Sequence, residues 1–358
     1  MISAEFVVER DDFFMDIKLE IPSTGATVLF GPSGSGKTTF INVLSGIIKP
    51  ISGLIKVGNA TFFDSENKIN LPIEKRGIGY VFQDGRLFPH MSVEENLDFG
   101  RKRSHDKTSR KKEIIELLGL GQLLQRKPST LSGGERQRTA IGRAILSGPS
   151  FLFMDEPLAA LDFARKQEIL PYIAILKKNL KIPIIYVSHQ MEEVVRLADH
   201  LVLLENGKII DHGQIFDVIN SPSLGILLGK DDKTSLINCH VDKENGKDGL
   251  SKLVFPGGYF LVNQRNLAPL ENVRIELKAQ DVALALEKPV ATSIANILGA
   301  SVAKIETSKD THCDVLLSVG NVSIWARITQ QSASRLGLKI GSQVFALIKS
   351  AAIRPFYS

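Results

Sequence analysis

One stretch of the sequence decides its fold: Gly31-Pro32-Ser33-Gly34-Ser35-Gly36-Lys37-Thr38. It fits the phosphate-loop pattern G-x-x-x-x-G-K-[ST], with an apolar run typical of a buried strand before it and a helical pattern after it. Glycines let backbone N–H groups face phosphate oxygens, and the start of a helix adds positive partial charge. Lys37 is expected to contact the β- and γ-phosphates of a nucleotide and Thr38 to ligate magnesium. The predicted nucleotide-binding residues are Gly31, Pro32, Ser33, Gly34, Ser35, Gly36, Lys37, Thr38 and Thr39.

A pair of acidic residues follows the second informative strand. The apolar run at 151–154 ends directly in Asp155 and Glu156. Ligands of open α/β sheets bind beyond the carboxyl ends of the strands, so these side chains are expected to reach the same nucleotide. We expect Asp155 to bind magnesium and Glu156 to act as the general base towards water. An Asp-Glu pair by itself is ordinary surface charge; the phosphate loop makes it informative.

The letters LSGGERQR at 131–138 narrow the class of protein. Ser132 is typical of a helix N-cap, and Gly133 and Gly134 leave backbone N–H groups accessible to an anion. This stretch resembles the signature of the ABC ATPase family. The resemblance implies a homodimer in which the signature residues of one subunit, Ser132, Gly133, Gly134 and Glu135, close on the ATP held by the phosphate loop of the other.

Further residues match motifs of that family in the family's order. Gln83 matches the glutamine that contacts magnesium and the attacking water, and His189 matches the histidine that senses the γ-phosphate. A lone histidine is otherwise more often structural. The stretch at 159–162 resembles the D-loop, with alanine where serine is common. The aromatic residue that stacks on adenine stays open between Phe13 and Phe14, either of which also suits a core position.

The chain divides into three predicted parts. Residues 1–229 alternate strands and helices, which predicts a mostly parallel α/β sheet; the family resemblance implies a P-loop (RecA-like) ABC ATPase core with a helical subdomain. Residues 230–288 are predicted to be a linker and a first β subdomain, and residues 289–356 a small OB-like β-barrel of the Mop/TOBE type.

The C-terminal part suggests the transported substrate. Residues 79–90 resemble the variant found in molybdate importers, and 292–299 and 324–328 resemble the molybdenum-binding Mop module. Ser293 and Asn296 are candidate oxyanion ligands, since an oxyanion needs hydrogen-bond donors more than charge. The alternative is that this part is a dimerising spacer in which both residues only form turns.

Composition excludes several other classes. The hydrophobic fraction of 43% and the charged fraction of 23% are those of a globular protein, and no apolar run approaches the roughly 20 residues of a membrane span. The net charge of +5 gathers partly in the basic stretch 101–112, but no aromatic residues alternate with those charges, so nucleic acid is not an expected partner. Cys239 and Cys313 are far apart and predict neither a zinc site nor a disulfide.

The resemblance therefore implies an ATPase subunit that uses ATP and Mg²⁺ to energise import of molybdate, or of tungstate, with molybdate also a candidate ligand of the C-terminal domain. Its expected partners are a second copy of itself, a pair of integral membrane permease subunits and, indirectly, a periplasmic oxyanion-binding protein. Its expected place is the cytoplasmic face of the inner membrane, as a peripheral protein. The alternatives are an importer of another oxyanion or small solute, and an oxyanion-sensing or storage protein.

Overall fold

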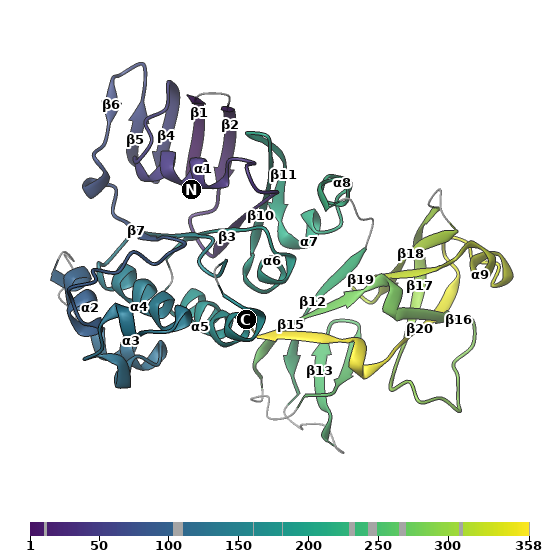
Figure 1. The fold of residues 1–358 in the computed structure, drawn as a ribbon. Coiled ribbons are helices and arrows are strands. Elements are labelled where there is room, and N and C mark those ends of the chain that lie inside the picture. The colour runs from purple at the N-terminus through teal and green to yellow at the C-terminus, as the bar shows by residue number, and fades with distance from the viewer. Residues whose placement is uncertain are drawn as a thin grey trace. The chain divides into compact units, whose positions relative to one another are not determined.

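The computed structural model describes the chain except for residues 11–12, 103–109, 160, 181, 229–232, 243–248, 265–269, 308–310 and 358. The described residues form two units, Met1–Val218 and Ile219–Ser358 (Figure 1). The predicted boundary at 229/230 and most of the basic stretch at 101–112 fall outside the described residues. One residue of the predicted D-loop, Ala160, lies outside them too.

A six-stranded sheet forms the centre of the first unit, in the order β11-β10-β3-β9-β8-β7. All neighbours are parallel except β10 and β11. The apolar runs before the phosphate loop and at 151–154, which the sequence analysis interpreted as strands, are β3 and β8, so this prediction is confirmed. The strands are β3 (Ala26–Phe30), β7 (Ile78–Val81), β8 (Phe151–Asp155), β9 (Ile184–Ser188), β10 (His200–Glu205) and β11 (Lys208–Gln214).

A second sheet of this unit corrects the sequence interpretation. It is antiparallel, with five strands in the order β2-β1-β4-β5-β6, whereas residues 1–229 were expected to form one mostly parallel sheet. In β1 and β2 every second residue is apolar and buried, which is the pattern of a sheet with one face in the core. The strands are β1 (Ile2–Arg10), β2 (Phe13–Ile21), β4 (Ser52–Val57), β5 (Ala60–Asp64) and β6 (Ile69–Asn70).

Helix α1 (Lys37–Ser45) connects the phosphate loop to the core. Its side chains at Phe40, Ile41 and Leu44 are buried in one hydrophobic cluster with residues of both sheets. The C-terminus of the helix is held by Arg76, whose buried guanidinium donates to the carbonyls of Val43 and Leu44. A positive charge there also opposes the negative end of the helix dipole. The loop that precedes α1 is therefore anchored on a rigid element.

The remaining helices of the first unit follow the strands. Figure 1 shows α2, α3 and α4 grouped beside β7, which fits the helical subdomain that was predicted. Their bounds are α2 (Val93–Lys102), α3 (Lys111–Leu117), α4 (Gly133–Leu146), α5 (Phe163–Leu180), α6 (Met191–Leu197) and α7 (Ile215–Val218), with short 3-10 turns at Ile73–Lys75, Gly121–Leu123 and Pro128–Thr130. Within the described parts of the chain, no helix has the length and apolar character that crossing a membrane requires.

The second unit begins with α8 (Pro222–Leu228) and continues as two antiparallel sheets, each of five strands. The first sheet has the order β14-β13-β12-β15-β21 and contains β12 (Thr234–Val241), β13 (Ser251–Phe255), β14 (Gly258–Val262), β15 (Asn272–Lys278) and β21 (Arg354–Tyr357). The second has the order β16-β20-β17-β18-β19 and contains β16 (Val282–Ala285), β17 (Asn296–Thr307), β18 (His312–Val319), β19 (Val322–Thr329) and β20 (Gln343–Ile348). Between strands lie α9 (Gln330–Arg335) and 3-10 turns at Ala279–Asp281 and Ser350–Ala352.

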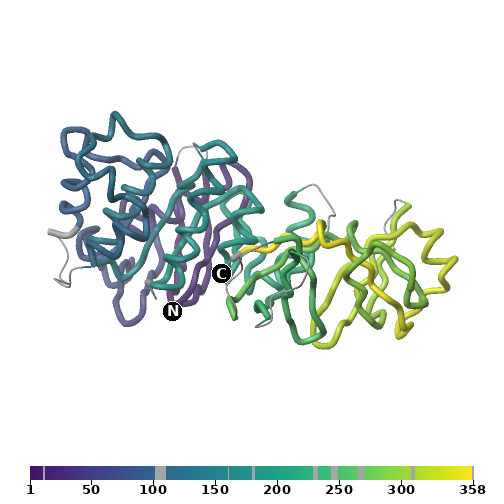
Figure 2. The backbone as a smooth tube through the Cα atoms, turned by 90° about the horizontal axis from the view of Figure 1, so that it is seen from below, coloured from purple at the N-terminus to yellow at the C-terminus, as the bar shows by residue number. Residues whose placement is uncertain are grey.

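The two sheets of this unit share one hydrophobic core. Residues of the first sheet such as Phe260 and Ile275 belong to the same buried cluster as Val315 and Ile348 of the second. The chain's last strand, β21, drawn in yellow in Figure 2, returns to pair with β15. Removal of residues 289–356 would therefore expose the inner face of the sheet that remains, and a cut near the boundary at 218/219 spares both sheets.

The core of this unit also holds the two cysteines. Cys239 and Cys313 are buried and free. Burial raises the pKa of the Cys239 thiol to about 12, so it stays protonated at neutral pH.

Candidate active site

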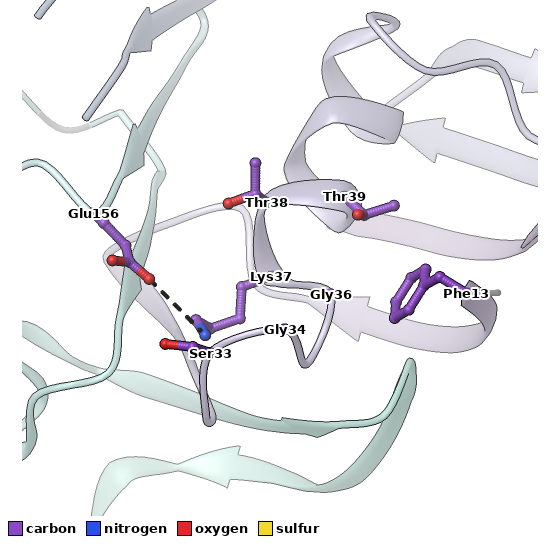
Figure 3. Close-up of a pocket in the computed structure, with 8 residues that line it drawn as sticks. All are labelled: Phe13, Ser33, Gly34, Gly36, Lys37, Thr38, Thr39 and Glu156. Carbon is purple, nitrogen blue, oxygen red and sulfur yellow. Dashed lines mark ion pairs between the residues drawn. The ribbon is translucent and has the colours of Figure 1, made fainter. Parts of the chain in front are cut away.

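A cavity of about 380 Å³ opens at the carboxyl ends of the parallel strands in the first unit. Figure 3 shows the phosphate loop wrapping around it, with Glu156 facing Lys37 across the space. The lining combines glycine backbone, hydroxyl groups, one ammonium and one carboxylate, a set suited to a polyphosphate. The lining residues are Phe13, Ser33, Gly34, Gly36, Lys37, Thr38, Thr39 and Glu156.

The Lys37 ammonium is held inside the phosphate loop. It donates to the carbonyl oxygens of Gly31 at 2.9 Å and Pro32 at 2.8 Å, and lies 3.5 Å from the hydroxyl of Ser35. Burial lowers the pKa of this ammonium, while the carboxylates of Glu156 and Asp155 act in the opposite direction. The loop therefore presents a desolvated positive charge at the cavity.

Phe13 forms the wall of the cavity beside Gly36. At Gly36 the backbone has a φ of +103°, and a Cβ there would lie 2.7 Å from Cζ of Phe13. Glycine is required at this position for both reasons. Phe14 is on the opposite face of β2 and is 52% exposed, so of the two aromatic candidates only Phe13 lines the cavity.

Thr38 and Asp155 meet on one side of the cavity. The Thr38 hydroxyl donates to Oδ1 of Asp155 at 2.9 Å. Burial raises the pKa of the Asp155 carboxyl, and its hydrogen bonds with Thr38 and Tyr80 oppose that shift. A hydroxyl next to a carboxylate, beside a phosphate loop, is a pair of oxygen donors that suits Mg²⁺. Thr38 and Asp155, two of the residues predicted to bind magnesium, are therefore suitable ligands for the ion.

Sequence reasoning missed Tyr80. Its hydroxyl lies 3.3 Å from Oδ2 of Asp155 and 3.0 Å from Oδ1 of Asn42, in the middle of α1. Burial, with Asp155 next to it, raises the pKa of Tyr80 well above its usual range, so the phenol stays neutral. The residue lies in β7, and no spacing in the sequence relates it to Asp155.

Glu156 lies between Lys37 and His189. Its Oε1 is 4.0 Å from Nζ of Lys37 and its Oε2 is 3.2 Å from Nδ1 of His189. The backbone of Glu156 has a φ of +42°, a left-handed conformation that residues other than glycine rarely adopt. Strain of this kind, about 1–3 kcal/mol, is typical of functional sites. The strands β8 and β9 thus bring two predicted catalytic residues into contact.

Gln83 is placed elsewhere. It lies in the turn that follows β7 and its side chain is exposed. Among the described residues that line the cavity, Gln83 does not appear. Its predicted contacts with magnesium and water therefore require movement of this turn and stay a prediction.

The signature residues form the exposed N-terminus of α4. Ser132 is the N-cap, and a capping box links it to Glu135: the Glu135 N–H donates to the Ser132 hydroxyl at 3.3 Å, and the Ser132 N–H to Oε2 of Glu135 at 2.7 Å. At Gly133 a Cβ would lie 2.9 Å from Cδ2 of Leu161, so a larger residue there would require the Leu161 side chain to shift. Gly134 is buried beside it. The predicted cap is confirmed, and the four residues lie apart from this chain's own cavity lining in the described structure.

Ser293 and Asn296 differ in environment. Ser293 is exposed, in the bend before β17. Asn296 is 2% exposed and joins the two sheets: its Oδ1 accepts from the N–H of Leu261 at 2.6 Å, and its Nδ2 donates to the carbonyls of Leu261 and Ile348. Asn296 thus has a structural role here, and an oxyanion would have to replace these hydrogen bonds to bind it.

Comparisons with known proteins agree with this description. The ABC transporter family model matches residues 14–159, and the TOBE domain model matches residues 292–355. The chain is 43% identical to the molybdenum import ATP-binding protein ModC of Paramagnetospirillum magneticum, over 99% of this chain and 98% of that protein. It is 44% identical to the ModC of Brucella melitensis, over 92% and 91%.

Solved structures resemble the first part of the chain. The cbiO1 protein of Clostridium perfringens, described as part of an ABC transporter complex, has a TM-score of 0.54 at 27% identity and covers 62% of this chain and 92% of its own. A nucleotide-free ATP-binding cassette from an ABC transporter has a TM-score of 0.52 at 26% identity, covering 64% and 95%.

Proposed function

The chain belongs to the molybdenum import ATP-binding proteins of the ABC transporter family, and from that membership we propose that it hydrolyses ATP to drive import of molybdate through a membrane permease. The observation that carries the proposal is a cavity lined by Lys37, Thr38 and Glu156. Asp155 accepts a hydrogen bond from Thr38, and His189 contacts Glu156. These are the groups that phosphoryl transfer to water requires: a cation for the phosphates, a base and a magnesium-binding pair.

In the proposed mechanism a water molecule attacks the γ-phosphorus of ATP and the bond to the β–γ bridging oxygen breaks, which leaves ADP. Glu156 accepts the proton of the attacking water. Lys37 exchanges its contacts with the loop carbonyls for the β- and γ-phosphates. Thr38 and Asp155 would hold magnesium, which would offset negative charge on the phosphate oxygens. His189 orients Glu156 and contacts the γ-phosphate, and Gln83 joins the site when the turn after β7 moves inward.

The adenine ring is assigned to Phe13. The ring of Phe13 lines the cavity next to Gly36, where the flat face of a base can stack on it. Phe14 points away and has no part in this assignment.

The working unit in this proposal is a homodimer. The residues Ser132, Gly133, Gly134 and Glu135 lie at the start of α4 and would close on the ATP of a second copy. The backbone N–H groups of Gly133 and Gly134 are the proposed donors, because those of Ser132 and Glu135 are used within the capping box. The dimer would associate with a pair of integral permease subunits at the cytoplasmic face of the inner membrane. A periplasmic oxyanion-binding protein would deliver the substrate to that permease.

Molybdate is the proposed substrate, and the TOBE domain is its second proposed site, with Ser293 and Asn296 as candidate ligands. Ser293 is the better candidate because it is exposed, whereas the amide of Asn296 is already hydrogen-bonded. Tungstate, with the same charge and shape, is the expected competitor.

Uptake of radioactive molybdate tests the proposal. Cells that lack the chain should lose uptake, and regain it with the parent chain but not with Glu156→Gln. Loss of sulfate or sugar uptake with molybdate uptake unchanged would instead favour an importer of another solute. Molybdate retention without dependence on Glu156 would favour a storage protein.

A further inference from the structure

A buried polar cluster includes Ser188, the residue before His189 in the chain, and the proposed mechanism does not use this cluster. Its centre is the carboxylate of Glu193, in the first turn of α6, which is 4% exposed. Oε2 accepts hydrogen bonds from the hydroxyls of Tyr186 at 2.9 Å and Ser188 at 2.7 Å. Oε1 lies 3.6 Å from the ammonium of Lys166, in the first turn of α5, which is 8% exposed.

The carboxylate and its partners come from three elements. Tyr186 and Ser188 belong to β9, Glu193 to α6 and Lys166 to α5. Burial, with Glu193 beside it, raises the pKa of Tyr186 well above its usual range, so this residue is a neutral donor. A buried carboxylate without partners is strongly unfavourable, so this satisfied network fixes the three elements in one arrangement.

The Ser188 hydroxyl extends the network around His189. It donates to Glu193 and accepts from the backbone N–H of Gln190 at 3.0 Å. These contacts hold the chain on both sides of His189, at the point where β9 ends and α6 begins. The His189 ring itself is 40% exposed and meets Glu156 at 3.2 Å. The position of the His189 ring is therefore determined more by the backbone at Ser188 and Gln190 than by side chains packed around the ring.

We propose that Glu193, through Ser188 and with Lys166 as its counter-ion, is a positioning residue that holds the backbone at His189 and so the imidazole against Glu156. This inference rests on the proposed ATPase function. Lys166 makes the arrangement sensitive to α5, because a shift of that helix removes the charge that pairs with Glu193. The position of His189 is thereby coupled to the segment that follows Glu156 in the chain.

The neighbouring residue Glu192 provides a matched control. It also joins α5 to α6, through a hydrogen bond from Gln167. Gln167 in turn accepts from Arg196. This second link connects the same two helices, but among the described hydrogen bonds it has no contact with Ser188. A change at Glu192 therefore tests the packing of α5 against α6 without a direct effect on the position of His189.

The test uses Glu193→Gln, Ser188→Ala and Glu192→Gln in the full chain. Glu193→Gln and Ser188→Ala should lower kcat for ATP about tenfold, the effect of losing a hydrogen bond to a charged group, with KM for ATP changed less than about twofold. Glu192→Gln should leave both constants near those of the parent. In chains with ¹⁵N-labelled histidine, the imidazole signals of His189, assigned by their loss in His189→Ala, should move in the first two variants only.

A double-mutant cycle gives the decisive comparison. In a His189→Ala background, measured by single-turnover hydrolysis of radiolabelled ATP, Ser188→Ala should have no further effect, because the residue it positions is absent. An equal additional loss in that background would overturn the proposal, as would unchanged His189 signals in Glu193→Gln. The histidine signals do not depend on ATPase activity, so an inactive parent chain would refute the proposed function while this inference stays testable.

Discussion

Nδ1 of His189 lies 3.2 Å from Oε2 of Glu156, and the two residues follow the ends of the neighbouring parallel strands β9 and β8. The left-handed backbone of Glu156, with its φ of +42°, turns this side chain into the cavity. The carboxylate is 19% exposed. A base that is held between an ammonium and an imidazole is oriented before substrate binds, which reduces the reorganisation that catalysis requires.

Replacement of Glu156 by glutamine should abolish most hydrolysis and spare binding. The amide keeps the size of the side chain but cannot accept the proton of water, so turnover should fall by roughly 10²- to 10⁴-fold. ATP binding, measured by equilibrium dialysis with labelled ATP, should remain. The exposed Glu168 on α5 offers the control, since Glu168→Gln should behave like the parent. Normal turnover in Glu156→Gln would exclude this residue as the base.

Most of these residues could be predicted from the sequence because each motif is a contiguous run of residues. The phosphate loop, the Asp-Glu pair and the capped glycine pair are each contiguous in the sequence, and the order of the parallel strands brings the first two to one edge of the sheet. Tyr80 and Phe13 were missed or left open because their roles depend on which residues face each other across elements. Tyr80 reaches Asp155 only because β7 and β8 are neighbours, and Phe13 reaches Gly36 only because β2 lies over the loop.

The assignment of the adenine ring predicts different effects at two adjacent residues. Phe13→Ala removes a ring from the cavity wall and should raise KM for ATP roughly tenfold, the size of a base–aromatic stacking contact. Phe14→Ala changes an exposed residue and should leave KM unchanged. Phe13→Tyr should retain stacking and serves as the conservative variant. Equal KM values for the two alanine variants would mean that the adenine ring does not stack on Phe13.

A shared site predicts complementation between two inactive chains. Lys37→Ala disables the phosphate loop, and Ser132→Arg blocks the signature at the start of α4. In an equal mixture that exchanges subunits at random, about half of the dimers are mixed, and each has one site with both elements intact. If the sites act independently, the mixture should show about a quarter of the parent's ATPase rate. A mixture that stays as inactive as its components would contradict either the dimer or the independence of its sites, and a fully active monomer on size-exclusion chromatography would exclude the dimer.

The second unit was harder to predict in detail. The sequence predicted that this unit is built from β-strands, and the glycine pair Gly257-Gly258, where the chain turns from β13 into β14, fits that prediction. The return of β21 to β15 was not, because a pairing between the end of the chain and a distant strand leaves no local signal. The same holds for Asn296, whose hydrogen bonds reach Leu261 and Ile348 across two sheets.

The oxyanion proposal predicts that molybdate stabilises the chain and that the two candidate ligands differ. Molybdate at about 100 times its dissociation constant should add about 2.7 kcal/mol of stability, which corresponds to a rise in Tm of roughly 5–10 °C. Sulfate, which is smaller, should have much less effect. Ser293→Ala alters an exposed side chain, so it should leave Tm without molybdate unchanged and reduce the rise that molybdate produces. Ser323→Ala, at another exposed serine of the same unit, is the matched control.

Asn296→Ala should act differently because its amide is part of the core. The substitution leaves the backbone N–H and carbonyl of Leu261 without their partners, at about 1–3 kcal/mol for each buried group, so Tm should fall even when molybdate is absent. Differential scanning calorimetry of the four chains separates the two effects. A molybdate-induced rise that survives in Ser293→Ala would remove Ser293 from the site. No rise in the parent chain would leave the second unit with a structural role, in which Asn296 joins its two sheets.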